Sequence, residues 1–115
     1  MVFNVSYSQL YVGKVNVSEL DSLRYLLIEF ESASPSGYVN QYNVDLGPYN
    51  YLKKKVDYFT DSTGKNEVDL KGNMSAIINY ISNSGWDFVQ MTVNDYALSS
   101  GNNSYYHILL FKRKR

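Results

Sequence analysis

Apolar residues recur with helical spacing in one segment of the chain, over about residues 73–84. They occupy positions i, i+3, i+4 and i+7 and therefore share one face of a helix. These residues are Met74, Ile77, Ile78 and Ile81. Asn73 precedes them with a side chain suited to an N-cap, and Gly85 follows with the freedom that a C-terminal cap requires. The pattern predicts one amphipathic helix.

The residue after the glycine extends this prediction. If Gly85 is the first residue beyond the helix cap, Ile81 and Trp86 are the two residues whose side chains meet in a Schellman ending. We therefore expect Trp86 to pack against Ile81 and to lead directly into a strand.

Two pairs of segments have the pattern of β-hairpins. The first pair is residues 24–32 and 38–46, which flank a turn-rich stretch containing Pro35 and Gly37. The second pair is residues 86–96 and 105–112, separated by a stretch rich in serine, glycine and asparagine. Alternation in the first pair and apolar content in the second both favour strands over helices.

The second hairpin is apolar at both odd and even positions. Strands that are apolar on both faces need cover on both faces, whereas the single predicted helix covers one. The sequence therefore predicts that the other face is met by a second layer, by curling of the sheet, or by another chain.

The remaining segments are less regular. Residues 2–17 alternate in part and predict one long strand or two short ones bent at Gly13, and residues 18–23 are compatible with a helix. Residues 61–66 have the composition of a turn, and residues 68–70 have that of a short strand.

Taken together, the patterns predict a single α+β domain over residues 1–115. We expect a mainly antiparallel sheet of about five or six strands, with one principal helix, about 73–84, packed on one face.

Composition narrows the function classes. The chain of 115 residues is 44% hydrophobic and 19% charged, which is typical of a globular domain. It has no cysteine, which excludes disulfides and thiolate chemistry, and its formal net charge is zero, which excludes a global field that draws in nucleic acid. No run of apolar residues has the length of a transmembrane helix.

The basic residues are concentrated in two clusters. They are Lys53, Lys54 and Lys55 in the middle of the chain, and Lys112, Arg113, Lys114 and Arg115 at the C-terminus. Basic side chains near tyrosines are compatible with a polyanion or single-stranded nucleic acid. A basic strand end is also a common means of protecting a sheet edge, and the zero net charge disfavours nucleic acid.

His107 is the only histidine and lies within the last predicted strand, two residues after Tyr105. Nucleophilic catalysis would need a hydroxyl and an orienting acid near it in space. Its apolar and aromatic neighbours favour a histidine packed in the sheet, so a small hydrolase or lyase using His107 is an alternative rather than the leading hypothesis.

A metal site is disfavoured by ligand types and spacing. One histidine and no cysteine leave only carboxylates for a transition metal. A calcium loop placed on Gly64 would have Phe59 and Leu70 at its first and last ligand positions, where carboxylates are required. We expect no cofactor.

The twelve tyrosines are the compositional anomaly. Tyrosine combines apolar area with a hydroxyl and is enriched at binding interfaces. Several of them on one exposed face would form a recognition surface for a protein or a saccharide.

Three features of the C-terminal half occur together: the helix with its Asn79-Tyr80-Ile81 step, the run Gly85-Trp86-Asp87-Phe88-Val89, and a closing strand from Tyr106 to Arg113. With these features the chain resembles a family of short uncharacterised bacterial proteins of unknown function. Val44-Asp45-Leu46-Gly47 and the stretch from Asp61 to Lys65 are also similar. The resemblance covers about residues 25–113, which makes residues 1–24 an extension, and it implies a small α+β domain without catalytic residues to carry over.

The leading hypothesis is a non-enzymatic binding or assembly module, with a homodimer joined through an apolar or tyrosine-rich sheet face as one form of it. The partner is then a protein, either a second copy or another chain. The candidate binding residues are Tyr105, His107, Lys53, Lys54, Lys55, Lys112 and Arg113. A cytoplasmic location is the default, and export is the alternative because many similar proteins have the features of exported proteins.

Overall fold

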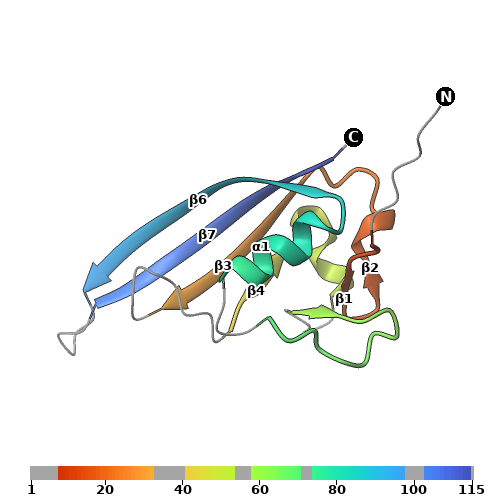
Figure 1. Cartoon of the computed structure of the whole chain (residues 1–115), viewed down its shortest axis with the longest axis horizontal. Coiled ribbons are helices and arrows are strands. Elements are labelled where there is room, and N and C mark those ends of the chain that lie inside the picture. Colours follow the sequence, from red (N-terminus) through yellow and green to blue (C-terminus); the bar gives the residue numbers. More distant parts are fainter. Residues whose placement is uncertain (1–7, 33–40, 54–57, 71–73, 98–102, 115) are drawn as a thin grey trace.

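The computed structural model describes residues 8–32, 41–53, 58–70, 74–97 and 103–114. This part of the chain contains ten elements, arranged as in Figure 1. In chain order they are β1 (Tyr11–Val12), β2 (Val15–Asn16), the 3₁₀ helix η1 (Val17–Glu19), β3 (Tyr25–Ser32), β4 (Asn43–Asp45), the 3₁₀ helix η2 (Gly47–Leu52), β5 (Phe59–Thr60), α1 (Met74–Ser82), β6 (Trp86–Ala97) and β7 (Asn103–Arg113). The α+β class is confirmed.

The larger of two sheets has four antiparallel strands in the order β4-β3-β7-β6. β3 and β7 pair along eight consecutive positions, from Tyr25 opposite Lys112 to Ser32 opposite Tyr105. β6 and β7 form the predicted C-terminal hairpin, and their far ends extend beyond α1 in Figure 1. The first predicted hairpin is also present, with β4 limited to three residues; residues 33–40 lie outside the described part of the chain.

The smaller sheet has three short strands in the order β2-β1-β5, so the strands are divided between two sheets rather than gathered in one. The predicted bend at Gly13 is confirmed, because its φ of 60° is favourable only for glycine and lets β1 turn back into β2. The Thr60 hydroxyl donates to the Gly13 carbonyl oxygen at 2.6 Å and ties this turn to β5.

The helix α1 forms where its apolar spacing predicts, but it ends at Ser82 rather than at residue 84. Gly85 has the expected positive φ, 95°. The last carbonyls are satisfied close by: the Ser84 backbone N–H donates to the Ile81 oxygen at 3.0 Å, and its hydroxyl donates to the Tyr80 oxygen at 2.9 Å. Asn73, the predicted N-cap, lies outside the described residues.

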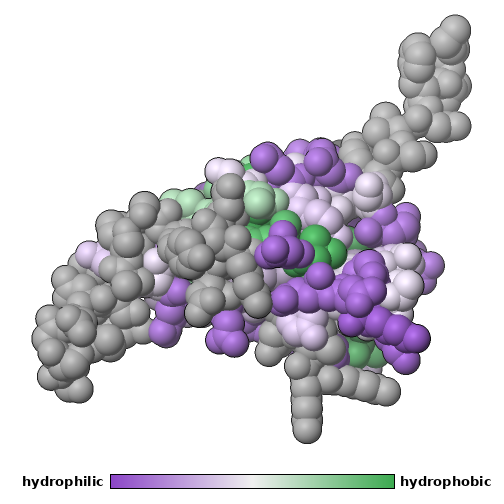
Figure 2. Space-filling model, turned by 60° about the horizontal axis from the view of Figure 1, so that its bottom comes forward, coloured by the Kyte–Doolittle hydropathy of each residue, from purple (hydrophilic) through white to green (hydrophobic). Residues whose placement is uncertain are grey.

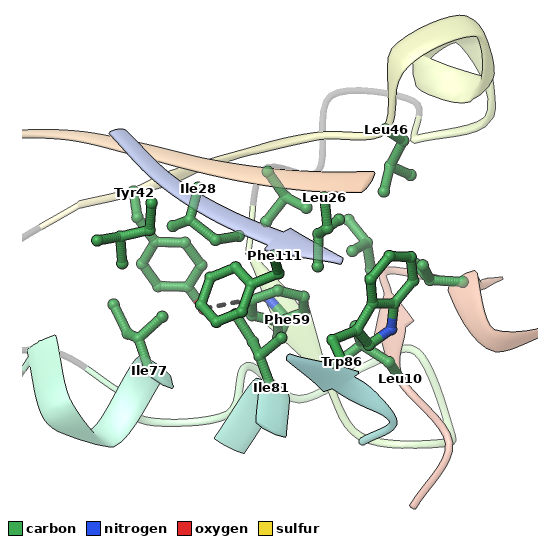
Figure 3. Packing of buried hydrophobic residues seen from close by; sticks show 14 of the residues in the cluster. Leu10, Leu26, Ile28, Tyr42, Leu46, Phe59, Ile77, Ile81, Trp86 and Phe111 are labelled. Carbon is green, nitrogen blue, oxygen red and sulfur yellow. Dashed lines mark hydrogen bonds between the residues drawn. The ribbon is translucent and has the colours of Figure 1, made fainter. Parts of the chain in front are cut away.

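The core lies between α1, the small sheet and one face of the large sheet (Figure 3). Alternate residues of β3 and β7 point into it, as the period of a strand requires. From these two strands they are Leu26, Ile28, Phe30, His107, Leu109 and Phe111. Ile77 and Ile81 point from the helix toward the sheet, and Trp86 is buried in the same cluster. Ile81 and Trp86 are thus both buried in this core, while the predicted contact between their side chains stays a prediction.

Two local predictions are corrected. Residues 18–23 do not continue into an α-helix; η1 covers only Val17–Glu19, and Asn16 caps it by accepting from the Ser18 N–H. Residues 68–70 do not form a strand, although Glu67 makes an isolated bridge with Thr60 and the Val68 N–H donates to the Phe59 oxygen.

A buried hydrogen bond joins the loop before β4 to the small sheet. The Phe59 backbone N–H donates to the Tyr42 hydroxyl oxygen at 3.0 Å, marked by the dashed line in Figure 3. The two rings stack with centroids 5.8 Å apart. Burial raises the pKa of Tyr42, so the phenol stays neutral.

Replacing Tyr42 with phenylalanine keeps the ring but leaves the buried Phe59 N–H without its acceptor. We expect Tyr42→Phe to lower the free energy of unfolding by about 1–3 kcal/mol, measured by urea denaturation. Tyr51→Phe is the matched control, because Tyr51 is 75% exposed and should change stability very little. Equal effects of the two substitutions would contradict the role of this bond.

Candidate functional site

The candidate site is β6, an exposed strand at the edge of the large sheet. Every residue from 87 to 94 is exposed, although β6 is the longest strand of the described chain. Four of these residues are large and apolar: Phe88, Val89, Met91 and Val93, with exposed fractions of 40%, 49%, 39% and 37%. Solitary exposed apolar residues are ordinary on a protein surface, whereas a row of them along one strand marks an interaction site.

The pairing with β7 shows which face of the sheet each residue occupies, because residues directly opposite each other share a face. Phe88 lies opposite Phe111, Met91 opposite Leu109, and Val93 opposite His107. These β7 residues all point into the core. Phe88, Met91 and Val93, here called the β6 stripe, therefore lie on the helix side of the sheet.

A β-bulge interrupts the alternation between Phe88 and Gln90. It inserts Val89 as an extra residue, so an even position before it and odd positions after it face the same side. The sequence pattern predicted a β6 that is apolar on both faces. Up to residue 94, the bulge instead concentrates Phe88, Met91 and Val93 on one face.

The opposite face of β6 is polar and uncharged after the bulge. Gln90, Thr92 and Asn94 lie opposite Leu110, Ile108 and Tyr106 of β7. On β7 these three residues are half-buried, whereas His107, Leu109 and Phe111 on the helix side are buried. The Tyr106 hydroxyl donates to a Glu29 carboxylate oxygen at 2.7 Å. This hydrogen bond, together with burial, raises the pKa of Tyr106 to about 12.

The outer edge of β6 is unpaired within the described chain, because β6 stands at the end of the strand order. An edge strand presents N–H and C=O groups that can pair with a further strand. Natural proteins protect such edges with lysine, proline, short strands or bulges. Residues 88–94 contain no charged residue and no proline, and the bulge lies near one end, so within the described part of the chain this stretch of the edge has little protection.

Figure 2 shows a face on which hydrophilic side chains predominate, with a small hydrophobic group near the middle of the view. Among the side chains that the structure describes, three tyrosines are exposed, Tyr25, Tyr51 and Tyr58, and they lie outside β6. Tyr105 and Tyr106 lie next to β6, opposite Asp95 and Asn94, and both are half-buried.

His107 is placed where it serves packing. Its side chain is 0% exposed and stacks on Phe30, with ring centroids 4.6 Å apart and planes at 7°. Tyr105, two residues earlier, is half-buried and pairs with Ser32. A substrate has no route to the His107 ring without opening the sheet.

The two basic clusters have separate surroundings. Lys53 donates to the Val44 carbonyl oxygen and contacts the Asn43 amide oxygen at 3.4 Å, while Lys54 and Lys55 lie outside the described residues. Lys112 is exposed and lies opposite Tyr25 on β3. Lys114 donates to the Ser82 carbonyl oxygen at 2.9 Å and stabilises the end of α1.

Arg113 is a structural residue that sequence reasoning took for a binding residue. Its guanidinium donates to four backbone oxygens of one loop, those of Val17, Ser18, Leu20 and Leu23, at 2.7–3.3 Å. It also lies over the Trp86 ring, 4.7 Å from the centroid, and burial lowers its pKa from the ordinary value. Arg113 thus fastens the η1 loop to the end of β7.

A shallow depression of about 190 Å³ lies beside this arginine. Ser18, Ser84, Gly85, Trp86 and Lys114 contribute to its lining, together with Arg113. The hydrogen bonds described above already occupy the Arg113 guanidinium and Lys114, so the depression offers little to a ligand.

Asp61 begins the turn predicted over residues 61–66. One carboxylate oxygen accepts from the Thr63 backbone N–H at 3.0 Å and from its hydroxyl, and the other accepts from the Asn66 amide at 2.9 Å. These bonds, led by the Thr63 hydroxyl, lower the pKa of Asp61 to about 2. The carboxylate is used to form the turn.

Within the described ranges, no three histidine or acidic side chains are grouped so as to hold a metal ion. None of the helices described has both the length and the apolar character needed to cross a membrane. Comparisons with protein-family models, with curated proteins and with solved structures found no match. The resemblance to short bacterial proteins therefore stays a prediction.

The Arg113 contacts predict that replacing this arginine, even with lysine, lowers the stability of the protein. We expect Arg113→Lys to lower the free energy of unfolding by about 2–3 kcal/mol, because a lysine ammonium cannot span four carbonyls or stack on Trp86. Chemical denaturation measures this loss. Lys112→Ala removes a neighbouring exposed cation and should cost much less; a comparable loss would mean that charge alone matters at this strand end.

The hydrogen bonds of Asp61 predict that the stability of the folded chain depends on pH. Its pKa is lower in the folded chain than in the unfolded one, so its stabilising effect is complete above about pH 4 and declines as the pH falls toward 2. Urea denaturation between pH 5 and 2 should show a steeper loss for the native chain than for Asp61→Asn. Parallel curves would show that the Asp61 bonds do not stabilise the turn.

Proposed function

We propose that this protein is a non-enzymatic binding or assembly module that receives an extended strand at the outer edge of β6. The observation that carries the proposal is the unbroken exposure of residues 87–94 along a sheet edge with which no described strand pairs. Strand addition supplies main-chain hydrogen bonds, and side chains on alternate positions supply specificity.

The β6 stripe gives this edge a source of affinity beyond the backbone. Backbone groups exchange water for a partner, so each such bond contributes only about 0.5–1.5 kcal/mol. Covering the exposed parts of Phe88, Met91 and Val93 adds roughly 1–2 kcal/mol for each side chain. An apolar strand is therefore a better partner than a polar one.

The burial of His107 supports a non-enzymatic role. A general base must lie within reach of a substrate proton, whereas this ring is enclosed between Phe30 and the surrounding core. Arg113 and Lys114 also use their donors within the fold, which weakens the alternative of a polyanion site.

Charging the stripe tests the proposal. A phage-displayed library of random twelve-residue peptides should yield binders with alternating apolar residues. We expect the double substitution Met91→Lys and Val93→Lys to reduce their affinity at least tenfold, because lysine on an edge opposes pairing.

The matched control places the same two charges at Tyr25 and Tyr51, which are exposed but lie outside β6. This variant should keep its affinity. Selection of no peptides from a chain shown to be monomeric would contradict the proposal, as would equal losses in the two variants.

A further inference from the structure

We propose that the strand received at this edge is β6 of a second copy, so that two chains form one continuous eight-stranded antiparallel sheet about a twofold axis. The inference rests on the proposed function and names its partner. Its basis is that β6 is complementary to itself in one particular register.

That register is centred on Thr92. With Thr92 opposite Thr92 of the second copy, Met91 lies opposite the partner's Val93, and Gln90 lies opposite the partner's Asn94. Apolar residues thus meet apolar residues on the helix side, and uncharged polar residues meet on the other side. Cross-strand pairs of matched character are what stabilise a sheet.

The bulge disfavours the two registers that are centred closer to it, on Gln90 and on Met91. A register centred on Gln90 sets Phe88, which lies on the helix side, against Thr92, which lies on the opposite side. A register centred on Met91 brings the extra residue Val89 into the paired stretch, opposite Val93. Centring on Thr92 keeps the bulge outside the five central pairs, where the strand alternates regularly.

Charge also permits this pairing. Residues 88–94 contain no charged side chain, and the whole chain has a formal net charge of zero. Two copies therefore approach without net repulsion, and no charged partner peptide is favoured along the central pairs. The two β6 stripes would then join across the axis into one apolar band on the helix side.

Cysteine cross-linking tests the register directly, because the chain contains no cysteine of its own. Opposite residues of an antiparallel pair have Cα atoms about 4.5–5.5 Å apart, within the range that a disulfide spans. Thr92→Cys should therefore form a disulfide-linked dimer under mild oxidation. Thr92 is exposed, so the fold should tolerate the change, and circular dichroism checks this.

Two further variants serve as internal controls. In the proposed register, Gln90→Cys alone and Asn94→Cys alone place equivalent residues roughly 14 Å apart, from four residues of strand rise, so neither should cross-link with itself. A mixture of the two should give a disulfide between unlike chains. Tyr51→Cys reports the rate of random collision.

Sedimentation of the cysteine-free chain at tens of micromolar should show a dimer, and the double substitution Met91→Lys and Val93→Lys should shift it to monomer. A monomer at 100 µM, with Thr92→Cys cross-linking no faster than Tyr51→Cys, would overturn the inference. Selected peptides that still bound the edge would then preserve the proposed function. Self-cross-linking of Gln90→Cys in place of Thr92→Cys would overturn the register.

Discussion

The pairing of β7 with β3 is the interaction on which the rest of the structure depends. It runs along eight consecutive positions and sets Leu26, Ile28 and Phe30 beside Phe111, Leu109 and His107 on one face. α1 and the small sheet pack onto that face. Because this pairing joins residues more than seventy positions apart, most of the core cannot form until the chain is nearly complete.

The same pairing explains why β6 is left at the margin. β7 has β3 on one side, so the hairpin partner must take the other, and no described strand remains to cover it. Trp86 and Arg113 hold the near end of the hairpin against the body of the protein. The far end extends past the helix (Figure 1), and β6 carries both the exposed apolar residues and a backbone edge with which no described strand pairs.

Much of this architecture follows from local sequence signals. The helix, the glycine that ends it, and both hairpins arise from periodicity and turn residues acting over short distances. The division into two sheets could not be predicted in the same way, because it depends on β1 pairing with β5 across almost fifty residues.

Arg113 was misjudged for a related reason: a basic cluster in sequence does not reveal that one member faces a loop of carbonyl groups. The sequence predicted the candidate edge only in part. The mixed parity of Phe88, Met91 and Val93 suggested that both faces of the strand are apolar, because a bulge cannot be predicted from alternation without knowing the partner strand.

The bulge between Phe88 and Gln90 has a consequence for how the hairpin can be arranged. A uniform strand can slide along its neighbour in steps of two residues and keep every side chain on its original face. A strand with one inserted residue cannot, because sliding moves the phase change onto different neighbours. The single extra residue therefore breaks the uniform alternation of β6 and limits the registers open to any strand that pairs across Val89.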